Sequence, residues 1–243
     1  MSKEKEVKKV DKKVEKKEEV KKVVKKSEPL FDNTKSYSIS EAIELVKKIN
    51  KAKFDASFEV HLRLGIDPKK GDQQVRGAVS LPNGTGKTVK VAAFVSPANE
   101  KAAKDAGADF VGGEDLIAEI KKTEKTDFQV AVAEPEMMKS LALIAKILGT
   151  RGLMPSPKND TVTQNPAKAI EELKKGKISF KNDDTANIHA VIGKVSFDSA
   201  KLAENFNVFI ATIRKAKPGS SKGVYLKNVS INATMSQGVK VSL

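Results

Sequence analysis

The stretch LPNGTGKT, residues Leu81–Thr88, ends in the three residues that close a nucleotide-binding loop, and its meaning decides the fold. Such a loop needs its first glycine five positions before Gly86, and this chain has Leu81 there. The loop must also lead into a helix whose N-terminal N–H groups hold the phosphate. Instead, the following TVKVAAFV (Thr88–Val95) alternates and is rich in β-branched residues, which predicts a strand. We therefore interpret the stretch as a turn between two strands and as a place for a hinge.

The residues before this turn predict antiparallel structure. Ser38–Glu41 has the pattern of a capping box and predicts the start of a helix. SFEVHLRL, residues Ser57–Leu64, alternates strictly between apolar and polar side chains, which is typical of a half-buried antiparallel strand. A second strand is expected over Gln74–Leu81.

The residues after the turn alternate between strands and helices, which is typical of a parallel α/β sheet. The expected strands are Val89–Val95, Ala108–Val111 and Phe128–Ala133, and the expected helices are Ala98–Ala106, Glu114–Lys122, Met137–Leu148 and Pro166–Lys175. From residue 174 onward the pattern returns to antiparallel strands, Ile178–Phe180, Asn187–Val195, Tyr225–Ala233 and Val239–Leu243, with a helix over Ser199–Lys215.

Two β-rich flanks around a βαβ block predict an insertion. We expect an α+β first domain, an antiparallel sheet with helices built from both chain ends (residues 36–84 and 176–243), and an inserted three-layer α/β domain (residues 85–175). The two crossings between them predict a hinge at Gly84, Gly86 and Gly176.

The composition favours a polyanionic partner. The 243 residues carry 45 Lys and Arg against 31 Asp and Glu, a net charge of +14. Residues 1–28 hold 12 Lys against seven acids, so +5 of this charge lies there; we expect residues 1–35 to be a disordered Lys/Glu/Val-rich tail. Nucleic acid is the default partner of such a chain. We expect no membrane span and a cytoplasmic location.

No catalytic constellation is visible in the sequence, and we expect no enzyme activity, cofactor or metal. The absence of Cys removes thiolate catalysis and cysteine-ligated zinc. His61 and His189 lie far apart among alternating residues, so each is interpreted as an ordinary strand residue. Glu134 follows an apolar strand and is interpreted as a strand-end residue. Two alternatives remain at this point: a nucleotide-binding enzyme in the βαβ block and a nonspecific basic scaffold for nucleic acids.

Six ordered motifs resemble the ribosomal protein L1 family in its bacterial form, the protein of the mobile stalk of the large ribosomal subunit. They are AKFDASFEVHLRLGID (Ala52–Asp67), VRGAVSLPNGTGK (Val75–Lys87), GADFVGGEDLI (Gly107–Ile117), LGTRGLMPSPKNDTV (Leu148–Val162), IHAVIGKVSF (Ile188–Phe197) and KPGSSKGVYLKNVSINATM (Lys217–Met235). The resemblance runs from about Ser36 to the C-terminus and leaves only the tail uncovered.

The resemblance implies that the first domain binds large-subunit ribosomal RNA near the site where deacylated tRNA leaves the ribosome. It also implies that the free protein, expected to be a monomer, can bind its own messenger RNA and repress translation. The family's contact positions fall on Lys53, Phe54, Glu59, Arg63, Asp183, Thr185, Thr234 and Met235, to which we add Lys194 and Ser236 from the same surface. The family usually has Gly-Pro after Thr-Met, whereas this chain has Ser236-Gln237, so it departs from the family pattern where a close backbone approach to RNA is implied.

Overall fold

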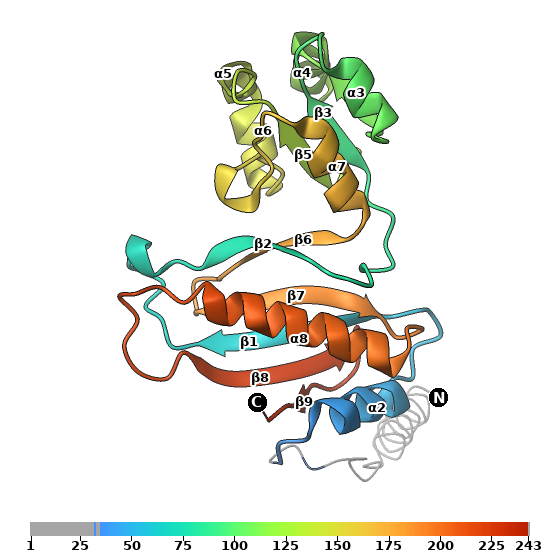
Figure 1. Ribbon diagram of the computed structural model, residues 1–243, viewed down its shortest axis with the longest axis vertical. Helices are drawn as coiled ribbons and strands as arrows, with labels where there is room; N and C mark the ends of the chain where they lie inside the picture. Colours follow the sequence, from blue (N-terminus) through green and yellow to red (C-terminus); the bar gives the residue numbers. More distant parts are fainter. Residues whose placement is uncertain (1–31, 33–34, 243) are drawn as a thin grey trace, which may run out of the picture. The chain divides into compact units, whose positions relative to one another are not determined.

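The computed structural model describes residue 32 and residues 35–242, and the described residues from Ser36 onward form one compact unit (Figure 1). The predicted tail, apart from Asp32 and Lys35, lies outside the described residues. The strands are β1 (Ser57–Leu64), β2 (Arg76–Ser80), β3 (Val91–Phe94), β4 (Phe110–Gly112), β5 (Val130–Ala133), β6 (Lys177–Lys181), β7 (Asn187–Lys194), β8 (Leu226–Ala233) and β9 (Val239–Lys240). The α-helices are α2 (Ile39–Ile49), α3 (Glu100–Asp105), α4 (Glu114–Thr123), α5 (Met138–Leu141), α6 (Ala145–Thr150), α7 (Pro166–Lys174) and α8 (Ser199–Lys215). Three 3₁₀ turns complete the order: η1 (Gly71–Gln73), η2 (Ala142–Ile144) and η3 (Pro157–Asn159).

The two ends of the described chain build one antiparallel sheet in the order β7-β1-β8-β9. The alternation predicted for β1 is present, since Phe58, Val60, Leu62 and Leu64 are all buried. Helices α2 and α8 contact each other and pack on strands β8 and β7, so they cover this apolar face (Figure 1). The opposite face of the sheet carries the polar residues of β1.

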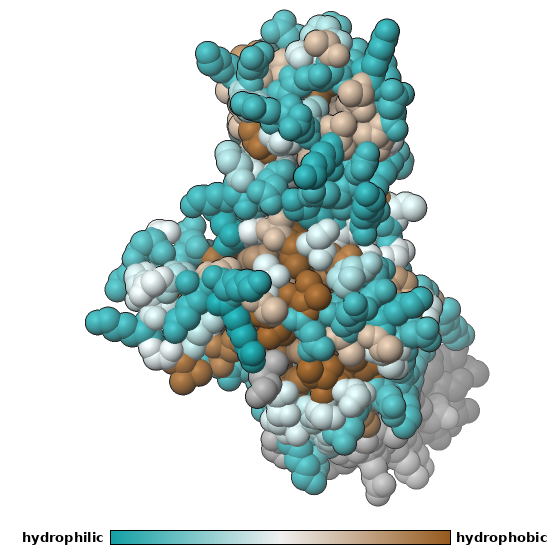
Figure 2. Space-filling model, in the orientation of Figure 1, coloured by the Kyte–Doolittle hydropathy of each residue, from teal (hydrophilic) through white to brown (hydrophobic). Residues whose placement is uncertain are grey.

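Both covering helices have apolar faces that match the sheet. The predicted capping box opens α2: the Ser38 hydroxyl accepts from the N–H of Glu41 at 3.4 Å, and the Glu41 carboxylate accepts from the N–H of Ser38 at 3.2 Å. Helix α8 buries Phe206 and Phe209 completely. Burial of each large apolar side chain stabilises the fold by about 1.5–3 kcal/mol. On the side of the molecule seen in Figure 2, hydrophobic residues gather on the surface around α8, while the surface around the parallel sheet is mostly hydrophilic.

The middle of the chain forms a parallel sheet in the order β4-β3-β5, with an apolar cluster on each face. One cluster contains Ile117 of α4 and Leu148 of α6, and the other contains Ala103 of α3 and Ile170 of α7. The predicted combination of helices with antiparallel and parallel sheets is therefore confirmed. The domain boundaries at residues 84–85 and 175–176 stay a prediction.

One expected helix is interrupted. Met137–Leu148 was expected to be continuous, but the 3₁₀ turn η2 separates α5 from α6. Residues i and i+3 eclipse in a 3₁₀ turn, so Leu141 and Ile144 lie on the same side, and both are completely buried. The 3₁₀ turn therefore keeps both apolar side chains in the core while it interrupts the helix.

Strands β2 and β6 form a separate two-stranded antiparallel ribbon beside the two crossings of the chain. Gly84 has φ +64°, Gly86 has φ +69° and Gly176 has φ +107°, the left-handed region that favours glycine. A Cβ on Gly176 would lie 2.5 Å from the Cα of Gly84, so the two crossings touch where neither residue has a side chain.

Helix α8 holds one of these crossings. Asn205, completely buried, donates from Nδ2 to the carbonyl of Gly84 at 3.0 Å and to that of Ile192 at 2.8 Å. Its Oδ1 accepts from the N–H of Asn83 at 3.1 Å. The first crossing is therefore anchored to the helix-covered sheet up to Gly84.

Candidate nucleic-acid interface

The face of the antiparallel sheet opposite the helices is a largely polar surface, which we call the outer face. On β1 it presents Glu59, His61 and Arg63, none of which is buried. The register places polar residues beside them: His61 lies between His189 and Ser230, and Arg63 lies between Asn187 and Asn228. Cross-strand neighbours of this kind have Cβ atoms about 5 Å apart. The outer face is therefore a closely spaced array of amides, imidazoles, hydroxyls and charged groups.

The two histidines form a pair at the centre of the outer face. Their Nδ1 atoms lie 2.7 Å apart, and Nε2 of His61 lies 2.9 Å from Oδ1 of Asn232. At that distance one Nδ1 must carry a hydrogen and donate the hydrogen bond, and the other Nδ1 must accept that bond. Asp183 lies 3.7 Å from His189, and Glu59 lies 3.9 Å from His61. The pair is thus part of a hydrogen-bonded row across three strands.

His61 and His189 are strand residues, as the sequence indicated, and the register of β1 and β7 also brings them into contact. Both stand at polar positions of alternating strands, and this was the signal available in the sequence. Pairing them also requires the bulge between Phe58 and Glu59, which the alternation does not reveal.

A second cluster lies where β8 ends beside the start of β1. The Thr234 hydroxyl lies 3.1 Å from Oε1 of Glu59 and 3.3 Å from the carbonyl oxygen of Ser57. The next residue, Met235, has φ +67° and an 89% exposed side chain. Phe54, which precedes β1, is 52% exposed. This end of the outer face therefore combines an oriented hydroxyl and carboxylate with two exposed apolar side chains.

Ser236, which stands where the family usually has glycine, has a structural task. Its Oγ accepts from the N–H of Ala233 at 2.9 Å, and its own N–H donates to the carbonyl of Ala233 at 2.8 Å. The serine side chain thus closes the turn that presents Thr234 and Met235.

A third cluster lies at the opposite end of the outer face, in the turn between β6 and β7. Asp183 accepts from the Thr185 hydroxyl at 2.6 Å and from the N–H groups of Thr185 at 3.0 Å and Asn187 at 2.6 Å. The Thr185 hydroxyl above all, together with these backbone donors, lowers the pKa of Asp183 to about 2. Ala186 takes φ +64° to close the turn. The side chains of Asp183 and Thr185 therefore hold each other in place. Asn187, which the sequence did not single out, is the third residue of this cluster.

The predicted basic residues differ in how they are held. Lys194 donates from Nζ to the carbonyl of Asp55 at 3.0 Å, which ties the end of β7 to the segment before β1. Lys53 and Arg63 are exposed, and within the described part of the chain neither forms an ion pair.

The predicted residues form two groups at the ends of one face, with the histidine pair between them. Lys53, Phe54, Glu59, Lys194, Thr234, Met235 and Ser236 belong to the β1-start group, and Arg63, Asp183 and Thr185 belong to the β1-end group.

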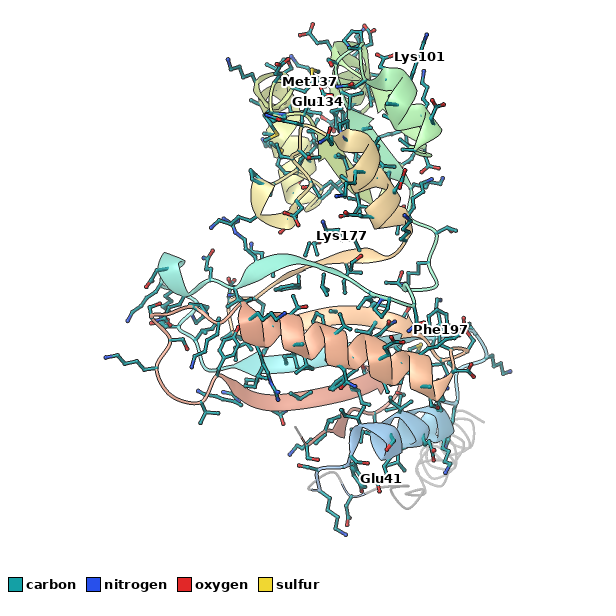
Figure 3. The ribbon with its side chains drawn as sticks, in the orientation of Figure 1. Glu41, Lys101, Glu134, Met137, Lys177 and Phe197 are labelled. Atoms are coloured by element: carbon teal, nitrogen blue, oxygen red, sulfur yellow. The ribbon has the colours of Figure 1, made fainter. Side chains whose placement is uncertain are left out.

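Glu134 has the strand-end position expected of it (Figure 3). Its carboxylate accepts from the N–H of Ser96 at 2.9 Å and from Nδ2 of Asn99 at 2.7 Å, and the residue is 6% exposed. These bonds join the ends of β5 and β3. Among the described residues, no group of three or more His, Asp or Glu side chains could hold a metal ion.

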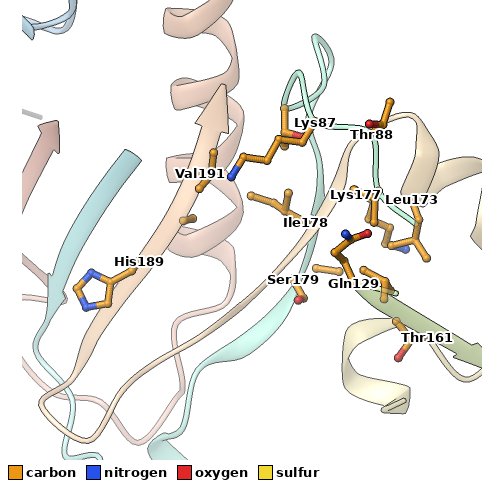
Figure 4. Close-up of a pocket in the computed structure, with 15 residues that line it drawn as sticks. Lys87, Thr88, Gln129, Thr161, Leu173, Lys177, Ile178, Ser179, His189 and Val191 are labelled. Carbon is orange, nitrogen blue, oxygen red and sulfur yellow. The ribbon is translucent and has the colours of Figure 1, made fainter. Parts of the chain in front are cut away.

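The stretch Leu81–Thr88 leads into β3 and not into a helix, so the structure confirms that it lacks the helix of a phosphate-binding loop. A cavity of about 390 Å³ lies beside it, lined by residues of β2, β5, β6, β7, α7 and the Thr85–Val89 segment (Figure 4). Its lining is largely apolar, and Figure 4 shows the Lys87 side chain extending toward Val191.

A broad polar sheet face and a strongly basic chain are together typical of the class of proteins that bind polyanions. Residues 46–237, about four-fifths of the chain, match the model of the ribosomal protein L1p/L10e family. The chain therefore belongs to the ribosomal protein L1 family, as the motifs indicated. Membership places it in the large ribosomal subunit as a protein that binds ribosomal RNA, in a family of structural ribosomal proteins. In the part of the chain that the structure describes, no helix has the length and apolarity needed to cross a membrane.

Proposed function

We propose that this protein binds the stalk region of large-subunit ribosomal RNA through the outer face of its antiparallel sheet. The single observation that carries the proposal is the β1-start group, in which Thr234 is hydrogen-bonded to Glu59 and is followed by the exposed Met235, while the exposed Phe54 lies in the segment before β1. Large apolar side chains at a polar surface favour contact with a partner that offers both flat apolar and polar surfaces. Folded RNA offers bases, sugars and 2′-hydroxyls together.

The chemistry of the outer face suits recognition by shape. Hydroxyls, amides and carboxylates can bond 2′-hydroxyls and base edges across a shallow RNA minor groove. Phe54 and Met235 pack on sugar or base surfaces, while Lys53 and Arg63 neutralise phosphates.

Glu59 contributes selectivity as well as contact. A carboxylate accepts hydrogen bonds and repels phosphate oxygens, so it favours a hydroxyl or amino group of the RNA and disfavours the backbone. Thr234 donates to this carboxylate and fixes its direction. DNA has no 2′-hydroxyl, so this pair favours RNA over DNA.

The inserted domain and the hinge have a role of their own, in addition to RNA binding by the outer face. We propose that residues 85–175 move relative to the RNA-bound part about Gly84, Gly86 and Gly176, and that this movement assists release of deacylated tRNA from the exit site. Support comes from the contact of the two crossings at Gly84 and Gly176 and from the fixed position that Asn205 gives the first crossing.

The same outer face provides a route to regulation. We propose that free protein binds a similar fold in its own messenger RNA and represses translation. Since one face would serve both ligands, the messenger fragment and the ribosomal RNA fragment should compete for the protein.

Competition binding tests the central part of this proposal. Labelled stalk ribosomal RNA is bound to the full chain and challenged with an unrelated RNA hairpin, duplex DNA and unlabelled stalk RNA at physiological salt. We expect only the unlabelled stalk RNA to compete at stoichiometric excess. Equal competition by all three would identify a nonspecific basic scaffold and reject the proposal.

A further inference from the structure

The last 39 residues of the chain contain no acid. After Glu204 there is neither Asp nor Glu, whereas Arg214, Lys215, Lys217, Lys222, Lys227 and Lys240 are all basic. Five of these six lie between residues 214 and 227, at the end of α8, in the loop that follows and at the start of β8. We call residues 214–227 the C-terminal basic loop.

This loop is held firmly against the end of β1. The N–H of Gly65 donates to the carbonyl of Tyr225 at 2.7 Å, and the Ser221 hydroxyl donates to the carbonyl of Gly65 at 3.1 Å. A Cβ at Gly65 would lie 2.1 Å from the carbonyl oxygen of Val224, so only glycine permits this approach. Gln73 of η1 donates to the carbonyl of Ser220 at 3.5 Å, and Figure 1 shows the loop and η1 at the same end of the sheet. The basic loop therefore has a defined position.

The loop continues the outer face directly. Arg63, a member of the β1-end group, pairs in register with Asn228, and Leu64 pairs with Leu226, so Lys227 lies between these two partners. At about 3.3 Å per residue, β8 separates Lys227 from Thr234 by roughly 23 Å. A ligand that covers the outer face from Thr234 to Arg63 thus reaches the basic loop at its far end.

Three of the five cations of the loop already have a favourable contact within the protein. Arg214 and Lys215 occupy the last turn of α8, where positive charge stabilises the helix dipole. The ammonium of Lys217 lies 6.0 Å from the centre of the Tyr225 ring, at the limit of a cation–π contact. Lys222 and Lys227 are exposed, and within the described residues none of the five cations forms an ion pair. Unpaired like charges on one ordered loop repel each other unless a polyanion lies between them.

We propose that the C-terminal basic loop is a second RNA-contact surface, in which Lys217, Lys222 and Lys227 bind backbone phosphates of the RNA that lies on the outer face. The proposal rests on the RNA-binding function proposed above and extends the contact area beyond Arg63. The outer face supplies selectivity, whereas the loop supplies electrostatic attraction and fixes the direction in which the RNA leaves the sheet.

The test is the salt dependence of binding by the full chain. Each phosphate contact contributes roughly 0.7–0.9 to the slope of log affinity against log salt. The triple variant Lys217→Gln, Lys222→Gln, Lys227→Gln should lower the slope for stalk ribosomal RNA by about 2. Between 50 and 200 mM salt the loss of affinity should then be about 15-fold smaller for the variant than for the wild type.

A matched control removes the same charge elsewhere. Lys101, Lys121 and Lys122 are exposed lysines of α3 and α4 without ion pairs among the described residues, and their triple Gln variant should keep the wild-type slope. Equal slopes for all three proteins, or the same decrease in both variants, would overturn the proposal, and the loop would then be open to an acidic protein segment.

The outcome separates the two proposals. If the wild type does not prefer stalk RNA over the unrelated hairpin, the proposed function fails. If it prefers stalk RNA and the loop variant keeps the wild-type slope, only the second surface fails. Circular dichroism confirms that each variant is folded, as expected for exposed Lys→Gln changes.

Discussion

The Thr234 hydroxyl lies 3.1 Å from the Glu59 carboxylate, so a residue just after β8 fixes the direction of a charged group on β1, 175 positions away in the sequence. The same hydroxyl lies 3.3 Å from the carbonyl of Ser57, and the N–H of Thr234 donates to that carbonyl at 3.0 Å. The turn, the strand start and the carboxylate are thereby coupled. This coupling is the local basis of the RNA-binding site that we propose.

The low pKa of Asp183 predicts that part of the free energy of unfolding is lost in acid. Because its folded pKa of about 2 lies below the ordinary 3.8, its contribution is present above pH 3.8 and is lost as the pH falls toward 2. Asp183→Asn should therefore remove part of the stability that the wild type loses in this window. We expect about 1 kcal/mol at pH 6, since the carboxylate is partly exposed and screened.

The neighbouring Asp184 provides the control. It is an exposed carboxylate of the same turn, and Asp184→Asn should follow the wild-type profile of unfolding free energy against pH. Denaturant melts at half-unit steps between pH 2 and pH 6 measure both. Parallel profiles for wild type and Asp183→Asn would contradict this account of the β6–β7 turn.

Gly176→Ala should destabilise the crossing of the chain. The new Cβ would lie 2.5 Å from the Cα of Gly84, and alanine disfavours φ +107°. We expect the free energy of unfolding to fall by about 1–3 kcal/mol. Gly149→Ala is the control, because a Cβ there meets nothing within 4 Å and alanine is favourable in α6. Equal stability of the two variants in urea melts would show that the close approach of the crossings is relaxed in solution.

Lys177 should stabilise the junction of α7 and β6 through two carboxylates. Its ammonium lies 3.0 Å from Glu172 and 3.1 Å from Asp160, with 12% of the side chain exposed (Figure 3). Burial alone would lower the pKa of Lys177, but the two carboxylates outweigh it and raise the pKa above 10.5. Lys177→Met leaves the carboxylates without a cation and should lower the free energy of unfolding by about 1–2 kcal/mol at neutral pH.

The pH dependence of this effect has a definite sign. A raised folded pKa means that the stabilisation is present below pH 10.5 and is lost as the pH rises through the folded value. The difference between wild type and Lys177→Met should therefore shrink in melts above pH 10.5. Lys175→Met removes an exposed pair with Glu171 at 3.5 Å and should change stability by less than about 0.5 kcal/mol. A Lys177→Met protein as stable as Lys175→Met would rule out a stabilising triad.

The sequence predicted local structure better than it predicted pairing. The bounds of β1 and of α8 agree with the structure, because alternation and a long apolar helical stripe are local signals. The Gln74–Leu81 strand was expected in the first domain without a named partner; in the structure β2 pairs with β6, and no local signal specifies that choice.

The candidate site was predictable to a similar degree. The family resemblance implied contact positions at Thr234, Glu59 and Asp183, and the structure adds the bonds by which each side chain is held. The His61–His189 contact could not be read from the sequence, since it depends on the register of two strands 128 positions apart and on a bulge. The Ser236 hydroxyl closes the turn that follows β8. The Gly-Pro that the family usually has after Thr-Met gave no indication of this role.

The most direct test of the proposed function is the affinity of Thr234→Val for stalk ribosomal RNA. Valine keeps the shape and the β-propensity but deletes the hydroxyl, so Glu59 loses its orienting donor. Specific binding should weaken by on the order of 1–3 kcal/mol. The free energy of unfolding should fall by less than about 1 kcal/mol, the salt slope should not change, and Thr150→Val on the exposed end of α6 should bind as the wild type does. Wild-type affinity of folded Thr234→Val for stalk RNA would contradict the assignment of the site, and an unfolded variant would show that Thr234 is structural.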